Sequence, residues 1–305
     1  MTLVETPTNE QVVQRYLTRY KHSKSSLYSR KYALRYFFEE RYFGFQGHIF
    51  DVKKRDIIDY FDYLNHKEDV CLTTKMNKWT YFRSFLQFCM EYYDLLIVIP
   101  KYSVNWKPIH KPADSNKDVV MNKEEVKRIL NHNYRYNYHY YIILRILAET
   151  GMRIGEFLSI NVEDVNVDKR LVKTKGKTGR KVYYYSRGLA KHLGIYLKER
   201  ELKNCECKAL FLSTLRHRYQ DTTITRYIHK CVERLEIEKR ISAHTFRRTL
   251  NTLRKKMGCP NEDRRILLCH KVSDVNFQCY VKLNYEDYIN LYDKWNPYKN
   301  LFAGG

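Results

Sequence analysis

A polar, proline-containing segment divides the chain into two parts and argues against a single continuous core. It covers residues 100–118, PKYSVNWKPIHKPADSNKD, with three prolines, four lysines and few apolar residues. Proline interrupts helices and central strands, and so polar a stretch cannot bury itself. The chain of 305 residues is also about twice the size of a common domain. The sequence therefore predicts two domains, 1–99 and 119–305, joined by a basic linker.

The first domain is predicted to be all helical. Thr8 and Gln11 have the spacing of a capping box, and apolar residues at helical spacing follow them. Further helical patterns cover 26–41, 53–65 and 73–92. Most of the abundant Tyr and Phe residues here are interpreted as core residues.

The second domain is predicted to be mostly helical with one small antiparallel sheet. Asn122 and Glu125 begin a helix with capping-box spacing. Residues 169–186, KRLVKTKGKTGRKVYYYS, alternate on both sides of a glycine-containing turn and predict a β-hairpin. Further helices are predicted at 136–150, 187–200, 222–235, 242–257, 260–268, 274–283 and 285–293. The predicted fold class is mainly α, with a minor β component.

The charge of the chain predicts a polyanionic partner. Lys and Arg number 56 against 34 Asp and Glu, a net charge of +22. Residues 1–110 carry 17 basic and 12 acidic residues, or +5, which leaves +17 for the rest. Such an excess repels itself unless the surface meets a polyanion, most commonly nucleic acid. A generally basic, solvated protein is the alternative interpretation.

Several other classes of protein are disfavoured. No apolar run approaches eighteen residues, and the first twenty residues lack the pattern of a signal peptide. The eight cysteines are scattered, which predicts reduced thiols inside a cell. Cys205-Glu206-Cys207 has no matching second pair, so no structural zinc is predicted. We expect a cytoplasmic, nucleoid-associated protein without a membrane contact.

Two segments of the second domain carry a cationic group in a defined local setting. Arg153 follows a glycine turn in TGMRIGEFLSI, and Glu156 lies three residues on, where it can orient the guanidinium. The predicted hairpin carries Lys175 and Lys177. Each of these residues alone can also be interpreted without a function, as part of a surface ion pair or of a solvated turn.

Two later segments add a histidine pair and a tyrosine. In SAHTFRRTLNTLRKK, Ser242 is a natural N-cap, and His244 and Arg247 share one face at the start of a helix, where anions are favoured. His270 and Tyr280 follow in LLCHKVSDVNFQCYVKL. The order and spacing of all these residues, taken together, suit phosphodiester chemistry.

The ordered set Arg, Lys, His-x-x-Arg, His, Tyr resembles the tyrosine recombinases, which include phage-type integrases, chromosome-dimer resolvases and transposon enzymes. TGMRIGE is similar to the family's first Arg motif, and HTFRRT to its His-x-x-Arg box. The resemblance covers nearly the whole chain. It implies a helical core-binding domain, a catalytic domain and a C-shaped clamp on double-stranded DNA. It also implies a homotetramer on synapsed recombination sites and no metal or nucleotide cofactor.

The resemblance assigns roles around a scissile phosphate. Arg153 and Arg247 would hold the two non-bridging oxygens and neutralise the charge of the transition state. Glu156 would hold Arg153 in place. His244 would bind the phosphate and accept the nucleophile's proton, and His270 would donate to a non-bridging oxygen.

The nucleophile and the general acid complete the set. Tyr280 would attack to form a 3′-phosphotyrosyl link, and Lys175 would protonate the departing 5′ oxygen. Lys177 is the alternative general acid, and Tyr285 and Tyr288 are minor alternative nucleophiles. Tyr280 lies ten residues after His270, where the family commonly has nine.

A further departure is Leu268-Cys269-His270, where the family usually has Leu-Gly-His.

The predicted function is site-specific DNA recombination through a Holliday junction, with a mobile-element integrase favoured. Chromosome or plasmid dimer resolution, type IB topoisomerase-like relaxation and a catalytically inert DNA-binding relative are the alternatives.

Overall fold

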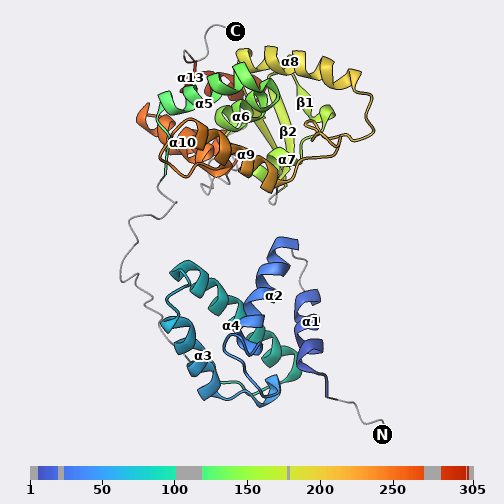
Figure 1. Ribbon diagram of the computed structural model, residues 1–305, viewed down its shortest axis with the longest axis vertical. Coiled ribbons are helices and arrows are strands. Elements are labelled where there is room, and N and C mark those ends of the chain that lie inside the picture. Colours follow the sequence, from blue (N-terminus) through green and yellow to red (C-terminus); the bar gives the residue numbers. More distant parts are fainter. Residues whose placement is uncertain are drawn as a thin grey trace. The chain divides into compact units, whose positions relative to one another are not determined.

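The computed structural model describes residues 6–19, 24–100, 119–176, 179–270, 283–299 and 301. The chain divides into two compact units, Met1–Ala113 and Asp114–Gly305 (Figure 1). This division falls inside the segment predicted as a linker, most of which lies outside the described residues. Each unit has a hydrophobic core of its own.

Unit 1 consists of helices, as the sequence predicts. They are α1 (Asn9–Arg19), α2 (Lys24–Phe38), α3 (Lys54–His66) and α4 (Leu72–Tyr93), with a short 3₁₀ turn η1 (Ile49–Asp51). The predicted capping box begins α1: the backbone N of Thr8 donates to Gln11 Oε1 at 2.9 Å, and the backbone N of Gln11 donates to Thr8 Oγ1 at 3.3 Å.

The core of unit 1 is built from aromatic rings. Phe37 of α2 is fully buried, and its ring centroid lies 4.4 Å from that of Phe82 and 5.2 Å from that of Tyr60. These rings come from α2, α3 and α4, so one cluster joins three helices, and α4 crosses α2 in Figure 1. Large aromatic rings bury much apolar area and so stabilise a small helical unit.

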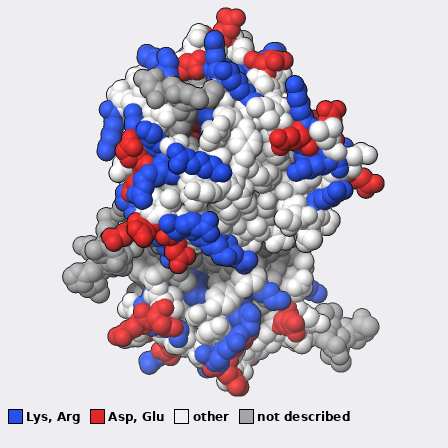
Figure 2. All heavy atoms as spheres, turned by 45° about the horizontal axis from the view of Figure 1, so that its top comes forward, with Lys and Arg blue, Asp and Glu red and all other residues white. Residues whose placement is uncertain are grey.

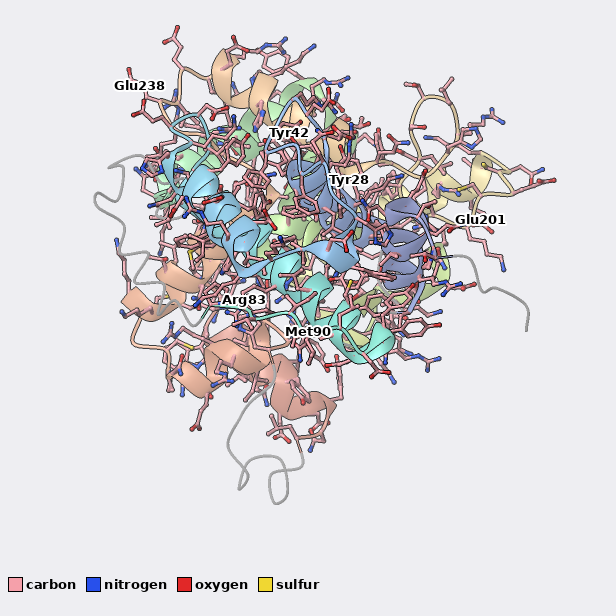
Figure 3. All side chains as sticks on the ribbon, turned by 90° about the horizontal axis from the view of Figure 1, so that it is seen from below. Tyr28, Tyr42, Arg83, Met90, Glu201 and Glu238 are labelled. Atoms are coloured by element: carbon pink, nitrogen blue, oxygen red, sulfur yellow. The ribbon has the colours of Figure 1, made fainter. Side chains whose placement is uncertain are left out.

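A row of tyrosines lies across α2 and the loop after it. Tyr28 stacks on Tyr32 with centroids 6.3 Å apart, and Tyr36 stacks on Tyr42 at 3.9 Å; Figure 3 labels Tyr28 and Tyr42. Lys78 of α4 is 3% exposed, and its Nζ lies 3.1 Å from the Tyr36 ring centroid. Burial lowers the pKa of Lys78 to about 8. The aromatic faces therefore stabilise a buried cation through cation–π contacts.

Unit 2 is mostly helical with one three-stranded antiparallel sheet, as predicted. Its strands are β1 (Val165–Asn166), β2 (Leu171–Gly176) and β3 (Gly179–Tyr184), in the order β1-β2-β3. β2 and β3 form the predicted hairpin, with Lys175 opposite Arg180 and Gly176 opposite Gly179. Strand β1 is not predicted from the sequence, because a strand of two residues shows no alternation.

The helices of unit 2 follow the predicted pattern, except for the short helix α7 (Ile154–Leu158), which is not among the predicted helices. They are α5 (Lys123–Tyr136), α6 (Tyr138–Thr150), α7 (Ile154–Leu158), α8 (Arg187–Leu202), α9 (Asp221–Arg234), α10 (Ala243–Lys256), α11 (Asn261–Leu267) and α13 (Tyr285–Lys294), with a 3₁₀ turn η2 (Val162–Asp164). The capping box of Asn122 and Glu125 begins α5, as predicted. The helix predicted at 274–283 falls outside the described residues. Among the helices of the described ranges, none is both long and apolar enough to span a membrane.

Helix α6 lies in the core of unit 2 and carries a buried ion pair. Arg145 Nε donates to Glu149 Oε1 at 2.8 Å, and both side chains are almost fully buried. Glu149 also accepts hydrogen bonds from Ser186 Oγ at 2.9 Å and Tyr292 Oη at 3.0 Å. A buried carboxylate that accepts several hydrogen bonds avoids the free-energy cost of an unpaired buried charge. This carboxylate joins α6 to the start of α8 and to the last turn of α13.

Helix α13 packs against other elements of unit 2. Arg170 holds Asp293 of α13 with two parallel hydrogen bonds of 3.0 and 2.7 Å. Trp295 Nε1 donates to Asp263 Oδ2 at 2.9 Å. Asp293 and Trp295 are thus bound by residues of the same chain.

Candidate active site

Arg247 connects three of the four predicted motif segments. Its Nη1 donates to the Gly151 carbonyl at 2.6 Å, and its Nη2 donates to the Leu268 carbonyl at 2.8 Å. Gly151 lies two residues before Arg153, and Leu268 lies two residues before His270. A guanidinium is a planar fork of donors, so one side chain can join two backbone segments. The Arg153 turn, the His-x-x-Arg helix and the His270 turn therefore meet at one place.

The start of α10 sets the positions of His244 and Arg247. Ser242 is the N-cap residue, as predicted, and its backbone N donates to Thr245 Oγ1 at 3.1 Å. Three residues apart on a helix, the two side chains point in similar directions. His244 is exposed, whereas Arg247 is only 5% exposed.

Arg153 is placed by the turn between α6 and α7. Gly151 ends α6 with φ +62°, and a Cβ atom there would lie 2.9 Å from a Leu268 methyl carbon, so the turn requires glycine. Arg153 is the N-cap of α7, and its Nη1 donates to Glu156 Oε1 at 3.1 Å. The Arg153 side chain remains 48% exposed, so its other donors can reach a ligand at the surface.

Glu156 also receives two donors that sequence reasoning missed. Lys181 Nζ donates to Oε1 at 2.6 Å, and Tyr183 Oη donates to Oε2 at 2.6 Å. Burial alone would raise the pKa of the Glu156 carboxyl, but hydrogen bonds from Lys181, Tyr183 and the Arg153 backbone lower it to about 2. The carboxylate is therefore ionised and joins α7 to strand β3.

A signal for Lys181 was present in the sequence. Lys181 and Tyr183 on β3 and Tyr185 just after it alternate and face the interior, where Tyr183 and Tyr185 are at most 1% exposed. A lysine in the inward register of a strand needs a carboxylate partner, because a buried unpaired ammonium is costly. The position of Lys181 in this register thus called for a nearby acid.

Both histidines have a lowered pKa. Burial and the charges of Arg247 and Arg153 lower the pKa of His270 to about 4. Although the His244 side chain is exposed on one side, partial desolvation of its ring and the charges of Arg248, Arg247 and Arg153 lower the pKa of His244 as well. The His270 Nε2 atom lies 2.5 Å from Arg247 Nη2. Because a guanidinium only donates, Nε2 is the acceptor and Nδ1 carries the proton in this arrangement.

Lys175 lies at the turn end of the hairpin, on the exposed face of β2. Its backbone N lies 3.3 Å from Ser159 Oγ, and Ser159 Oγ donates to the Glu156 carbonyl at 2.7 Å. Within the described residues no ion pair is found for the Lys175 ammonium. The alternative general acid, Lys177, lies outside the described residues.

The proposed nucleophile Tyr280 also lies outside the described residues. The two minor candidates can be placed. Tyr285 Oη donates to the Lys169 carbonyl at 3.0 Å, and the ring of Tyr288 stacks on that of Tyr184 with centroids 5.5 Å apart. Both contacts are at the end of the hairpin away from its turn. In this structure Tyr285 and Tyr288 are therefore remote from Lys175.

The second unit of this chain matches the model of a known family. The family model "Phage integrase family" matches residues 119–287, which is more than half of the chain. The chain belongs to the phage integrase family of tyrosine recombinases. It is accordingly an enzyme of DNA strand breakage and rejoining.

Curated relatives of this recombinase carry the name tyrosine recombinase XerC. The protein from Leptospira interrogans serovar copenhageni is 24% identical over 292 residues, or 91% of this chain and 89% of the relative. The protein from Caldanaerobacter subterraneus is 32% identical over 152 residues, or 49% of this chain and 42% of the relative. The first similarity spans both units.

Two solved structures of similar fold are recombinases in complex with DNA. The Tn1549 transposon integrase in complex with circular intermediate DNA has a TM-score of 0.69 at 14% identity, and the match covers 93% of this chain and 99% of that one. The XerH recombinase bound to palindromic difH substrate has a TM-score of 0.66 at 15% identity, covering 95% and 82%. These matches support the two-unit fold of this recombinase.

Cys269 occupies a backbone position that favours glycine. Its φ is +49°, in the left-handed region, which explains why the family usually has Leu-Gly-His here. The Cys269 thiol donates to the Val182 carbonyl of β3 at 3.2 Å, a contact that glycine cannot make. Burial raises the pKa of this thiol to about 11, so it retains its proton.

A cavity in unit 2 lies apart from these motif residues. It has a volume of about 660 Å³ and is lined by Arg145, Arg170, Lys191 and neighbouring residues. Arg170 precedes β2 and lies five residues from Lys175, roughly 17 Å along an extended strand. On the face drawn in Figure 2, basic and acidic side chains are interspersed rather than gathered in one patch. The candidate active site is instead a surface site with charged side chains, suited to a large substrate.

Proposed function

We propose that this recombinase cuts and rejoins double-stranded DNA at a specific site through a covalent bond to Tyr280. The observation that carries the proposal is the pair of hydrogen bonds from Arg247 to Gly151 and Leu268. They bring the Arg153 turn and the His270 turn to the start of α10. Two guanidiniums and two imidazoles then come from segments that meet at the start of α10, which suits a phosphate.

The proposed reaction is a transesterification. Tyr280 Oη attacks the scissile phosphorus and passes its proton to His244, while the bond from phosphorus to the 5′ oxygen breaks. Lys175 donates a proton to that leaving oxygen. The product is a 3′-phosphotyrosyl diester with a free 5′ hydroxyl, so the diester bond is conserved and the reverse reaction rejoins DNA.

The arginines are proposed to stabilise the transition state. Arg153 and Arg247 would donate to the two non-bridging oxygens, whose negative charge grows as the tyrosine attacks. A phosphate beside Arg247 Nη2 would replace His270 as the acceptor of that donor. His270 Nε2 could then carry the proton and donate to the phosphate.

The two units are proposed to close around the duplex as a C-shaped clamp. The excess of positive charge supports this proposal, because each phosphate contact releases counterions. Cutting the linker within 100–118 should leave two pieces that each bind DNA far more weakly than the whole chain, since the tether raises the effective concentration of the second contact. Binding by unit 2 alone that equals that of the full chain would contradict the clamp. We also propose that the enzyme is associated with the nucleoid.

One experiment both tests the proposed reaction and identifies the target DNA sequence. The enzyme is incubated with a randomised duplex library, and covalent adducts are captured after denaturation and sequenced. We expect adducts on one sequence class, with the link mapped to Tyr280 by mass spectrometry and a free 5′ hydroxyl. Tyr280→Phe should bind DNA and form no adduct. An adduct on Tyr285 or Tyr288, or none with the unmodified enzyme, would contradict the assignment.

The same site then distinguishes the modes of reaction. Strand exchange between two duplexes requires a synapsed homotetramer, whereas type IB topoisomerase-like relaxation needs one duplex and one protomer. Product that forms only with two copies of the site supports recombination. Sites at the two ends of a mobile element support the integrase role that the sequence favoured. A single chromosomal site supports dimer resolution, which the similarity to XerC along 91% of this chain favours.

A further inference from the structure

The carboxylate of Glu156 joins two parts of the active site that carry different chemistry. On one side it accepts from the backbone N of Arg153 at 2.9 Å and from Arg153 Nη1 at 3.1 Å. On the other side it accepts from Lys181 and Tyr183 of β3, both at 2.6 Å. The side chains of Glu156 and Lys181 are only 4% and 7% exposed. The two sides of the carboxylate therefore hold α7 and the hairpin at a fixed distance.

The turn end of the hairpin lies directly over this carboxylate. A Cβ atom on Gly176 would lie 2.9 Å from Glu156 Oε1 and 3.3 Å from Lys181 Cε, so the strand can approach this closely only as glycine. Gly176 follows Lys175. The position of Lys175 relative to Arg153 is therefore set where β2 crosses the Glu156 carboxylate.

The donors on the two sides are not equivalent. Arg153 and Glu156 are three residues apart in the first turn of α7, so their contacts are local and persist if the hairpin moves. Lys181 and Tyr183 lie 25 and 27 residues from Glu156, and their contacts depend on the hairpin being docked. Losing them should release the hairpin while leaving Arg153 in place.

We propose that Lys181 and Tyr183 are positioning residues that act through Glu156 to hold Lys175 at the leaving 5′ oxygen. This inference rests on the proposed function, in which Lys175 is the general acid. Lys181 itself is not the acid, because its ammonium is buried against Glu156. Ser159 provides a second, weaker tether on the Lys175 backbone at 3.3 Å, so removal of one donor should have a partial effect.

The test compares two leaving groups. Tyr183→Phe keeps the ring and removes one donor to Glu156. Tyr185→Phe is the matched control, because Tyr185 directly follows β3 and is equally buried but donates to the Asn166 carbonyl, away from Glu156. Single-turnover cleavage is measured on the mapped site with the natural 5′ oxygen and with a bridging 5′ sulfur, which leaves without a proton.

For Tyr183→Phe we expect cleavage of the oxygen substrate to fall by about 10-fold, as part of the 10²–10⁴ that a general acid supplies. Cleavage of the sulfur substrate should stay within about two-fold of the unmodified enzyme, as should both substrates with Tyr185→Phe. The double variant Lys181→Met/Tyr183→Phe should approach the loss seen with Lys175→Ala. Equal losses on both substrates would overturn the proposal, and so would no loss on either.

The underlying function is tested separately in the same experiment. Failure of the unmodified enzyme to cleave would refute the proposed function. If sulfur does not rescue Lys175→Ala but rescues Lys177→Ala, the general acid is Lys177. That outcome would overturn the positioning inference, which concerns Lys175; where Lys175 is the acid, the ratio of oxygen to sulfur rates for Tyr183→Phe decides the inference.

Discussion

Replacing Arg247 with lysine should separate its structural contribution from its chemical one. The arginine side chain is 5% exposed and donates to two buried carbonyls, at 2.6 Å to Gly151 and 2.8 Å to Leu268. A single ammonium cannot reproduce the planar fork that reaches both. At least one carbonyl then loses its partner, which costs about 1–3 kcal/mol. In a unit of this size that corresponds to a fall in Tm of roughly 2–12 °C.

The chemical loss should be larger and independent of the fold. Removing one preorganised donor from a developing charge lowers the rate by about 10²–10³. The assay is single-turnover cleavage of the mapped site, measured well below the Tm of every variant, with Tm recorded by calorimetry. Arg248→Lys is the matched control, because Arg248 is the next residue of α10 and its Nη2 lies 3.3 Å from Thr245 Oγ1. Its Tm and cleavage rate should change little.

Two results would refute this reasoning about Arg247. A Tm equal to that of the unmodified enzyme would mean that the carbonyl contacts do not stabilise the meeting of the three motif segments. Cleavage by Arg247→Lys at the unmodified rate would mean that the guanidinium is not needed at the phosphate. If Arg248→Lys also lowered both Tm and the cleavage rate, the losses would be a property of α10 in general and not of the Arg247 guanidinium.

Three further predictions concern single side chains of unit 2. Cys269→Gly should be more stable than Cys269→Ala by about 1 kcal/mol, because only glycine relieves the positive φ of +49°; equal Tm values would contradict this strain. The pKa of His139 is lowered to about 4 by burial, so the unfolded chain binds more protons between pH 6.5 and 4 and stability falls as pH falls through that window, by up to about 3 kcal/mol. His139→Phe should therefore raise Tm more at pH 5 than at pH 8, and an equal change at both would refute the titration. Tyr292→Phe removes the donor at 3.0 Å from the buried Glu149 and should cost about 1–3 kcal/mol in thermal denaturation, whereas an unchanged Tm would show that this bond does not hold α13.

Local features of the sequence determined the helices, the hairpin and several caps. Thr8, Asn122 and Ser242 each begin a helix with a hydrogen bond between a polar side chain and a backbone N–H three residues away. Such a bond depends only on near neighbours in the sequence. The hairpin followed from alternation around a glycine-containing turn. The contact of Arg153 with Glu156 is local in the same sense.

Contacts between distant segments were decided by the tertiary structure. The partners of Arg247 lie 96 and 21 residues away, and a chain pattern does not say which buried carbonyls a guanidinium will meet. Glu156 was predicted to hold Arg153, yet its two shortest hydrogen bonds come from β3, whose inward register places Lys181 and Tyr183 beside it. The residue types needed for phosphate chemistry could be read from the sequence. Their positions relative to one another are set by packing of the hairpin, α7 and α10. Buried polar groups lose water as a hydrogen-bond partner, and only the folded core brings protein groups into place as partners instead.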